Sequence, residues 1–298
     1  MPIHSKLIYE TATLKFAHQT LMNMRMTTLR MVFAAALIAG IGGSYAMPRA
    51  DYFQSAQATP GPKRPVLVEL FTSEGCSSCP PADALLAKLG SLQPVPGVEA
   101  IIMEEHVDYW DDQGWRDPFA SPVATNRQKE YAFHLGGEVY TPEMIVDGRA
   151  AFVGSEGTEA RKEIEAAAGF PKAEMSLAWA GTMRGDSGSL RVHIGRLPES
   201  ATNGKPEVFV AITENGLHSS VKRGENAGRA LAHDGVVHTL TRVGAANPKS
   251  ETAFDGEVPI SGPNTGWKHE NLRAVVFVQD PKTRRVFAAG AISYAAAQ

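Results

Sequence analysis

Cysteine is scarce in this sequence: Cys76 and Cys79 are the only two among 298 residues. So few cysteines exclude a disulfide-rich scaffold. Structural zinc normally takes four protein ligands, and the absence of a second CxxC motif disfavours a zinc site built from cysteines. The single motif, Cys76-Ser77-Ser78-Cys79, is therefore the first candidate for chemistry.

Other familiar signals are also missing. The sequence contains no P-loop, no dinucleotide-binding motif and no arrangement typical of a Ser-His-Asp hydrolase. Charge is mixed, with a formal net charge of −3 at pH 7, and neither a basic patch nor an acidic tail stands out. We therefore expect no nucleic-acid partner and no cofactor.

The CxxC motif lies between an apolar run, residues 66–71, and a segment with apolar residues at helical spacing, residues 80–89. A strand, a short loop with CxxC and then a helix is the arrangement typical of a redox-active dithiol. A structural bridge gains little here, because closing a loop of about four residues stabilises the fold by only roughly 2 kcal/mol. A metal site and a structural disulfide remain the alternatives.

The N-terminal region has the order of a secretory signal. Arg25 and Arg30 precede an apolar stretch, residues 31–41, and small residues follow it. The stretch is shorter than the roughly twenty residues that cross a bilayer, and a retained N-terminal membrane anchor is the alternative. We expect residues 1–46 to be a dispensable N-terminus plus signal peptide. The protein is then periplasmic or secreted, with no stable membrane span after cleavage.

The pattern changes near residue 170. Before it, strand-like and helical segments alternate, which predicts an α/β structure. The expected strands there are 66–71, 98–103 and 144–146, and the expected helices are 80–89, 121–135 and 158–168. Beyond it, the pattern favours a mainly antiparallel, sandwich-like β domain with strands at 175–180, 190–195, 207–214, 236–243, 272–279 and 286–293. The expected organisation is a flexible lead-in at 47–65, a first domain at 66–170 and a second at 171–298.

Two sets of residues carry a resemblance to known families. The strand, CxxC and helix, with Thr141-Pro142 ahead of a later short strand, resemble the thioredoxin superfamily over roughly residues 62–170. The string ELFTSEGCSSCPPAD at 69–83 and the segments 106–111 and 224–229 are similar to a family of uncharacterised secreted bacterial proteins with a thioredoxin-like domain. That family brings no established activity, so the thioredoxin resemblance supplies the chemistry by analogy of fold.

The thioredoxin resemblance implies a role for each matching residue. Cys76 matches the nucleophile and Cys79 the resolving cysteine of thiol–disulfide exchange. Tyr140, Thr141 and Pro142 match the cis-proline loop that faces the dithiol and pairs with substrate backbone.

Glu69 interrupts an otherwise apolar strand. It resembles the buried carboxylate that thioredoxins place behind their cysteines. A buried carboxyl with a raised pKa would move protons during the resolving step. The alternative is that strand alternation points Glu69 at solvent.

A dense polar and aromatic segment, residues 106–112, follows the expected second strand. One interpretation is a wall of a substrate groove, to which His106 and Trp110 contribute. The simplest interpretation is a loop folded around its own aromatics, with aspartates as turn formers. A third is a copper or zinc site formed by Cys76, Cys79 and His106.

A long polar connection in the second half carries several cationic side chains: His218, Lys222, Arg223, Arg229 and His233. We interpret it as a solvated loop that packs on its own domain. The alternative is a loop that reaches the CxxC motif or receives an anionic partner.

The sequence as a whole predicts an exported thiol–disulfide oxidoreductase that uses Cys76 and Cys79 on protein or small-molecule thiols and disulfides, with no metal assigned. The first alternative is a periplasmic copper-handling protein that uses the CxxC motif and a histidine. The second is a non-redox binding module with a structural disulfide.

Overall fold

The computed structural model describes residues 62–181, 187–201, 203–261 and 266–294. The expected signal peptide and nearly all of the lead-in lie outside these residues. None of the helices within the described ranges has both the length and the apolar character needed to cross a membrane.

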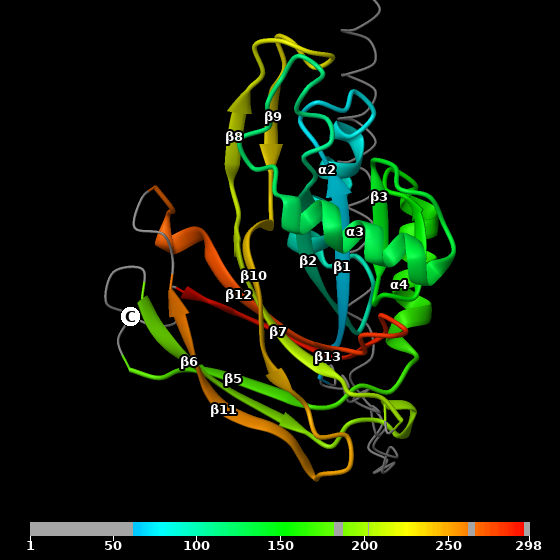
Figure 1. Ribbon diagram of the computed structural model, residues 1–298, viewed down its shortest axis with the longest axis vertical. Helices are drawn as coiled ribbons and strands as arrows, with labels where there is room; N and C mark the ends of the chain where they lie inside the picture. Colours follow the sequence, from blue (N-terminus) through cyan, green and yellow to red (C-terminus); the bar gives the residue numbers. More distant parts are fainter. Residues whose placement is uncertain (1–61, 182–186, 202, 262–265, 295–298) are drawn as a thin grey trace, which may run out of the picture. The chain divides into compact units, whose positions relative to one another are not determined.

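The described part of the chain is a mixed α/β structure (Figure 1). Its first half contains β1 (Arg64–Thr72), α2 (Pro80–Leu92), β2 (Val98–His106), α3 (Pro122–Leu135), β3 (Glu143–Val146), β4 (Ala150–Val153) and α4 (Gly157–Ala168). Its second half contains β5 (Met175–Trp179), β6 (Ser187–Gly195), β7 (Glu207–Glu214), β8 (Leu217–Ser220), β9 (Ala230–His233), β10 (Val236–Ala245), β11 (Thr252–Ser261), β12 (Leu272–Gln279) and β13 (Val286–Ser293), with 3-10 turns at Glu199–Ala201 and His269–Asn271.

One large mixed sheet has the strand order β13-β12-β7-β10-β2-β1-β3-β4. β1 and β2 are parallel, whereas most other neighbours are antiparallel. β10 joins β2 through the single pair Val236 and Glu104. Two smaller antiparallel sheets are formed by β11-β6-β5 and by β8-β9. Strands from both sides of residue 170 therefore share one sheet, and the division into two domains at that residue stays a prediction.

Local sequence explains where the helices begin. α2 starts with Pro80 and Pro81, which lack the N–H groups that a first helical turn leaves unpaired. Ser121 caps α3, and its side chain accepts a hydrogen bond from the backbone N–H of Val123. α3 ends at Gly136, whose φ of 76° requires the left-handed conformation that glycine adopts readily.

Strand alternation divides the side chains of β1 and β2 between two faces of the sheet. Val66, Val68 and Leu70 pack with α2 and α4 on one face. Phe71 packs with Tyr131 of α3 on the other. The same alternation puts Glu104 and His106 of β2 on the α2 face. It puts Glu69 and Glu105 on the α3 face.

A second core lies between the three-stranded sheet and the large one. Leu190, Val192 and Ile194 of β6 pack with side chains of β7 and β12, including Val210 and Val276. On the α3 face, a separate cluster brings residues of β1 and β2 against β7, β12 and β13. β13 is distant from β1 in the strand order but in contact with it, so the large sheet curls.

Several strands differ from the expectation. β2 continues past residue 103 to His106, because the glutamates and histidine at its end are buried rather than exposed. The short strands β4, β8 and β9 were not expected, and neither was β11 (Thr252–Ser261), in which Asp255, Gly256 and Glu257 interrupt the apolar residues. Short strands with exposed alternate residues give little apolar signal.

Candidate functional site

The two cysteines form a disulfide at the N-terminal end of α2. Their Cα atoms are 5.4 Å apart, and the carbonyl of Cys79 accepts hydrogen bonds from the backbone N–H groups of Ala82 and Asp83. Both cysteines have 0% exposed surface, although Ser77 and Ser78 between them are exposed. The disulfide is thus at a helix terminus, where a thiolate is stabilised, but it is covered.

The hairpin of β8 and β9, with its tip at residues 221–229, lies on the CxxC motif, and we call it the arm. The buried side-chain amide of Asn226 donates to the carbonyls of Glu74, at 2.8 Å, and Cys76, at 2.9 Å. Glu225 accepts a hydrogen bond from the backbone N–H of Ser77 at 3.1 Å. Our interpretation of this connection as a solvated loop on its own domain is therefore wrong. The arm reaches the CxxC motif, and Figure 1 shows it beside the start of α2.

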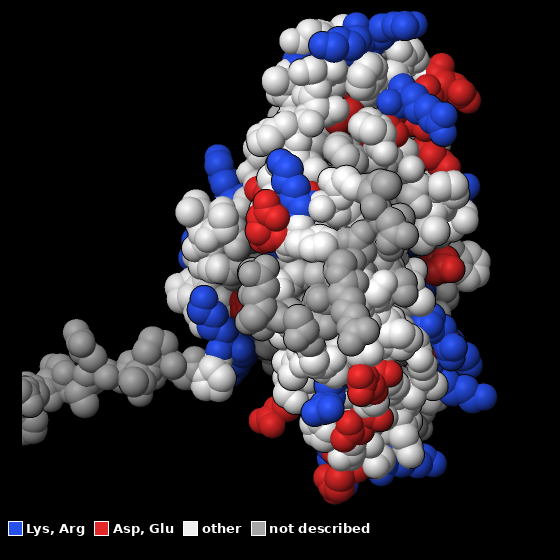
Figure 2. Space-filling model, turned by 90° about the vertical axis from the view of Figure 1, so that its left-hand side faces the viewer, with Lys and Arg blue, Asp and Glu red and all other residues white. Residues whose placement is uncertain are grey.

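The cationic residues expected in this connection mostly point outward. Lys222, Arg223 and Arg229 are exposed on the tip. Figure 2 shows Lys and Arg side chains at the upper end of the molecule, the end at which Figure 1 draws the arm. His233, by contrast, is buried at the base of the arm.

Three of the residues expected at the substrate side, Trp110, Thr141 and Pro142, lie close together. The Thr141–Pro142 peptide bond is cis, and Trp110 donates from its indole N–H to the Thr141 hydroxyl at 2.8 Å. A Cβ on Gly75 would lie 3.0 Å from Cβ of Trp110, so the indole stands against the residue that precedes Cys76. The Cβ atoms of Pro142 and Ala82, in the first turn of α2, each lie 3.2 Å from the position of a Cβ on Gly154.

Tyr140 does not share this arrangement through its side chain. Its carbonyl accepts a hydrogen bond from Gln128 at 2.6 Å, and Gln128 also donates to Glu143 at 2.7 Å. Burial raises the pKa of Glu143 to about 7.

Glu69 is buried, so the alternative interpretation, in which its side chain faces solvent, is wrong. It lies on the α3 face, opposite the helix that carries the cysteines. Arg127 Nε lies 2.5 Å from its carboxylate, and the Tyr131 hydroxyl also donates to it. Burial alone would raise the pKa of Glu69, but the charge and hydrogen bonds of Arg127 outweigh burial and lower it. The expectation of a raised pKa at Glu69 is therefore also wrong.

Glu69 belongs to what we call the arginine cluster, made up of Glu69, Glu105, Arg127, Tyr131 and Gln279. The three guanidinium nitrogens of Arg127 donate to Glu69, to Gln279 at 3.1 Å and to Tyr131 at 3.0 Å. Glu105 lies 3.2 Å from Arg127 Nε. Glu69 and Glu105 therefore share one cation, Arg127. Burial and the neighbouring charge of Glu69 raise the pKa of Glu105 well above its usual range.

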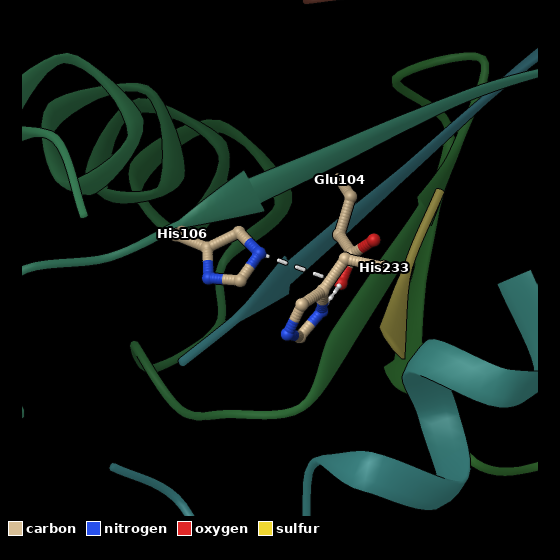
Figure 3. A group of neighbouring side chains, drawn as sticks. All are labelled: Glu104, His106 and His233. Carbon is tan, nitrogen blue, oxygen red and sulfur yellow. Dashed lines mark hydrogen bonds and ion pairs between the residues drawn. The ribbon is translucent and has the colours of Figure 1, made fainter. Parts of the chain in front are cut away.

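His106 lies in a second buried group, on the α2 face. We call this group the histidine cluster; its members are Glu74, Asp83, Glu104, His106, Asp117 and His233. Figure 3 shows the two imidazoles directed at the carboxylate of Glu104. Oε1 of Glu104 is 3.4 Å from His106 Nε2 and 2.7 Å from His233 Nδ1. The outer ring nitrogens face Asp117, at 2.7 Å from His106, and Glu74, at 3.3 Å from His233.

The charges of the histidine cluster shift its titrations strongly. Burial, and then the charge of Glu104, raise the pKa of Asp83 to about 7. Burial alone would lower the pKa of His233, but the neighbouring carboxylates of Glu104 and Glu74 raise it to about 9. The pKa of His106 is likewise raised well above its usual value, because Asp117 and Glu104 outweigh the effect of burial.

Three residues in the described part of the chain could hold a metal ion together. Donor atoms of Glu104, His106 and His233 all lie within 4.8 Å of one another. Neither Cys76 nor Cys79 belongs to this group, although the sequence offered them as partners of His106 in a copper or zinc site.

Most of the histidine cluster was missed at the level of sequence. Asp83 reads as an ordinary acidic residue in a first helical turn, and Glu104 follows the apolar run of β2. Asp117 sits in a loop, and His233 is 129 residues from its partner Glu104. Extending β2 to His106 would have revealed Glu104 and His106 on one face, two residues apart.

Comparisons with known proteins identify a family and structures of similar fold. A family model described as "Protein of unknown function (DUF1223)" matches residues 67–279. The crystal structure of protein AGR_C_4864 from Agrobacterium tumefaciens is similar at 26% identity and a TM-score of 0.58, over 78% of this chain and 95% of that one. HBP35 of Porphyromonas gingivalis is similar at 16% identity and a TM-score of 0.54, over 79% of this chain and 76% of that one, which shows a likeness of fold alone. None of the curated proteins matches the chain.

Proposed function

The chain belongs to the DUF1223 family of proteins of unknown function, and we propose that it is an exported thiol–disulfide oxidoreductase that acts on protein or small-molecule thiols and disulfides. The observation that carries the proposal is the Cys76–Cys79 disulfide at the start of α2. Trp110, Thr141 and Pro142 lie beside it and form the substrate side. Export fits a disulfide that persists, because oxidising compartments preserve such bonds.

The proposed fold of residues 66–170 is thioredoxin-like. Parallel β1 and β2, antiparallel β3 and β4, helices on both faces and a cis-proline ahead of β3 support it. For residues 171–298 we propose a sandwich-like arrangement, supported by the apolar layer between the β5-β6-β11 sheet and strands β7 and β12.

The proposed exchange begins with the reduced protein. The Cys76 thiolate attacks one sulfur of a partner disulfide, that disulfide breaks, and the departing partner sulfur leaves as a thiolate. Cys79, after losing its proton, attacks Cys76 in the mixed disulfide. The Cys76–Cys79 bond re-forms and the second partner sulfur is released as a thiolate. Two electrons pass to the partner, and the two protons of the dithiol end on its thiols.

Asp83, rather than Glu69, is the carboxyl suited to accept the proton of Cys79. It lies one helical turn after Cys79, and its backbone N–H donates to the Cys79 carbonyl. Burial, reinforced by Glu104, raises the pKa of Asp83 to about 7, near the value at which a group both takes and releases protons at neutral pH. Glu69 lies on the opposite face with its charge bound to Arg127.

Because both cysteines are buried, exchange requires the arm to move away. The contacts that hold the tip on the motif are few: two hydrogen bonds from Asn226 and one to Glu225. Breaking a few hydrogen bonds of about 1 kcal/mol each is a small barrier on the timescale of enzyme turnover.

The test is the equilibrium of the Cys76–Cys79 bond in glutathione buffers, quenched by alkylation and counted by mass spectrometry. We expect a reduction potential between roughly −270 and −120 mV, the span of known exchange proteins, reached within minutes. Cys79→Ser should accumulate a mixed disulfide with glutathione, whereas the matched Cys76→Ser variant should not. A potential well below about −300 mV without exchange over minutes would refute the proposal.

The burial of both sulfurs favours one other function, a binding module in which the disulfide is structural. In that case the reduced, folded protein resists alkylation at Cys76 for hours. Rapid alkylation at Cys76 supports the oxidoreductase instead.

A further inference from the structure

We infer that Glu104, His106 and His233 form a binding site for a divalent transition-metal ion, and that Zn²⁺ is the ion they suit. Their donor atoms converge within 4.8 Å, all three residues are buried, and they come from β2 and from the base of the arm. Two imidazoles and one carboxylate are a ligand set found in catalytic zinc sites. The inference uses neither sulfur, so it stands apart from the proposed redox function.

Each imidazole is held between Glu104 and an outer carboxylate. His106 directs Nε2 at Glu104 and places Nδ1 2.7 Å from Asp117. His233 directs Nδ1 at Glu104 and places Nε2 3.3 Å from Glu74. A carboxylate on the far nitrogen of a ligating histidine fixes its ring and raises its basicity, and metal sites use this arrangement regularly.

The outer carboxylates are themselves fixed. Asp117 accepts hydrogen bonds from the backbone N–H groups of Glu74, at 2.8 Å, and Phe119, at 2.9 Å. Glu74 accepts from the indole N–H of Trp115 at 2.7 Å. The other oxygen of Glu104 accepts from the backbone N–H of Asp234 at 3.0 Å. The orientation of Glu104, His106 and His233 is therefore set by residues other than these three.

Three buried atoms of this group lack a hydrogen bond in the described part of the chain: His106 Nε2, His233 Nε2 and Glu74 Oε1. Buried polar atoms are rarely left without a hydrogen bond, and a bound ion is one of the usual reasons. His106 Nε2 is the informative one, because it is aimed at Glu104 and has no other partner there (Figure 3).

The spacing suits a small tetrahedral ion. Two donors at about 2.1 Å from a zinc ion at tetrahedral angles are about 3.4 Å apart. Glu104 Oε1 and His106 Nε2 already have this separation, at 3.4 Å. Glu104 Oε1 and His233 Nδ1, at 2.7 Å, would widen by several tenths of an ångström.

The first measurement is metal binding by the purified protein with its disulfide intact, after removal of bound metal with a chelator. Titration with Zn²⁺ alone should give one equivalent by calorimetry. Co²⁺ should give the intense visible absorption of a four- or five-coordinate ion. The absence of binding by the wild-type protein overturns the inference and leaves a metal-free network of charged histidines.

Variants assign the site. Glu104→Gln and His233→Gln should each weaken Zn²⁺ binding by about 100-fold or more, since a direct ligand exceeds the 10- to 100-fold typical of outer partners. The matched control is His238→Gln, which breaks another histidine–glutamate contact, 2.7 Å from His238 to Glu214, outside the group. Unchanged binding in His233→Gln, or equal loss in His238→Gln, overturns the assignment.

Two further variants cover the case in which ligand variants fail to fold. Asp117→Asn keeps all three ligands and should lower the affinity 10- to 100-fold at unchanged stoichiometry. The double variant Cys76→Ser/Cys79→Ser should bind Zn²⁺ as the wild type does. If that variant loses the metal, the ion belongs to the sulfurs and this site is wrong.

Discussion

Strand β2 contributes to a buried charged cluster on each face of the sheet, and the two clusters are built on different principles. In the arginine cluster, a permanent cation donates through three nitrogens, to Glu69, Gln279 and Tyr131. In the histidine cluster the cations titrate, and two of their ring nitrogens have no hydrogen bond among the described residues. A permanent cation whose nitrogens are hydrogen-bonded is suited to a structural role. Titratable ring nitrogens without a hydrogen bond are suited to a chemical role.

The surroundings of the two clusters sharpen the difference. The arginine cluster lies among apolar residues of α3 and of the curled sheet, such as Phe71 and Phe277. The histidine cluster lies next to the disulfide: Asp83 is in the first turn of α2, and the carbonyl of Glu74 shares the Asn226 side chain with that of Cys76. We therefore expect changes to the first cluster to alter stability, and changes to the second to alter pH dependence and reactivity.

The largest effect is expected in the arginine cluster. Arg127→Met leaves Glu69 buried without its cation, and removing one partner of a buried ion pair typically costs about 3–5 kcal/mol of unfolding free energy. Denaturant unfolding measures this loss. The control is Arg196→Met, which breaks an exposed pair with Glu251 and should leave the midpoint nearly unchanged. If both variants lose the same amount, burial of the cluster is not what makes Arg127 important.

The next effect distinguishes the histidine cluster by its pH dependence. The folded protein holds a proton on Asp83 up to about pH 7, because burial and Glu104 raise its pKa, whereas the unfolded chain releases it near pH 4. The unfolded state therefore binds fewer protons between these values, and the unfolding free energy falls as pH rises from about 4 to about 7.

Asp83→Asn should remove this fall, so that at pH 8 the metal-free variant is more stable than the wild type by roughly 2–4 kcal/mol and at pH 4 nearly equal. Denaturant unfolding at several pH values measures the difference between the two curves. The exposed Asp112→Asn should run parallel to the wild type. A parallel curve for Asp83→Asn would show that its carboxyl is ionised in the folded state.

A smaller effect concerns the arm, which lies on the CxxC motif next to the histidine cluster. Asn226→Ala removes two of the three hydrogen bonds described between the tip of the arm and residues 74–77, and we expect dithiothreitol to reduce the disulfide about 10-fold faster. Lys222→Ala on the same exposed tip is the control and should leave the rate unchanged. Equal rates in all three proteins would mean that another segment limits access.

The smallest effect tests whether the arginine cluster takes any part in redox chemistry. Glu69→Gln should change the reduction potential and exchange rate less than 2-fold, because Glu69 lies on the face away from α2. Its loss of stability should also be modest, since Glu105 lies 3.2 Å from Arg127 and can ionise in its place. Glutathione equilibration and denaturant unfolding measure the two quantities. A slower resolving step in this variant would restore Glu69 as the proton carrier.

The sequence predicted best those elements whose ends carry local signals. Strands β12 and β13 match 272–279 and 286–293 at both ends. Their turn is fixed by Asp280, whose carboxylate accepts from the backbone N–H groups of Lys282 and Thr283. α3 is equally local, because Ser121 caps it and Gly136 ends it.

The histidine cluster could not be predicted in the same way. Its members come from β2, α2, two loops and the arm, and His233 of β9 reaches Glu104 only because β10, the strand that follows the arm, lies next to β2 in the large sheet. A buried glutamate gives no apolar signal, so the end of β2 resembled a loop. The predicted site residues had different outcomes. Trp110, Thr141 and Pro142 lie together, whereas the role of Glu69 depended on a face of the sheet that alternation alone did not identify.

The single pair of Val236 and Glu104 that joins β10 to β2 has a mechanical consequence. His233 ends β9 three residues before β10 starts, and Asn226 lies at the other end of the same hairpin. The hairpin therefore contacts Glu104 at its base and Cys76 at its tip. An ion that binds His233 and Glu104 and alters the reduction potential must, by thermodynamic linkage, be bound more or less tightly by the same factor when the disulfide opens.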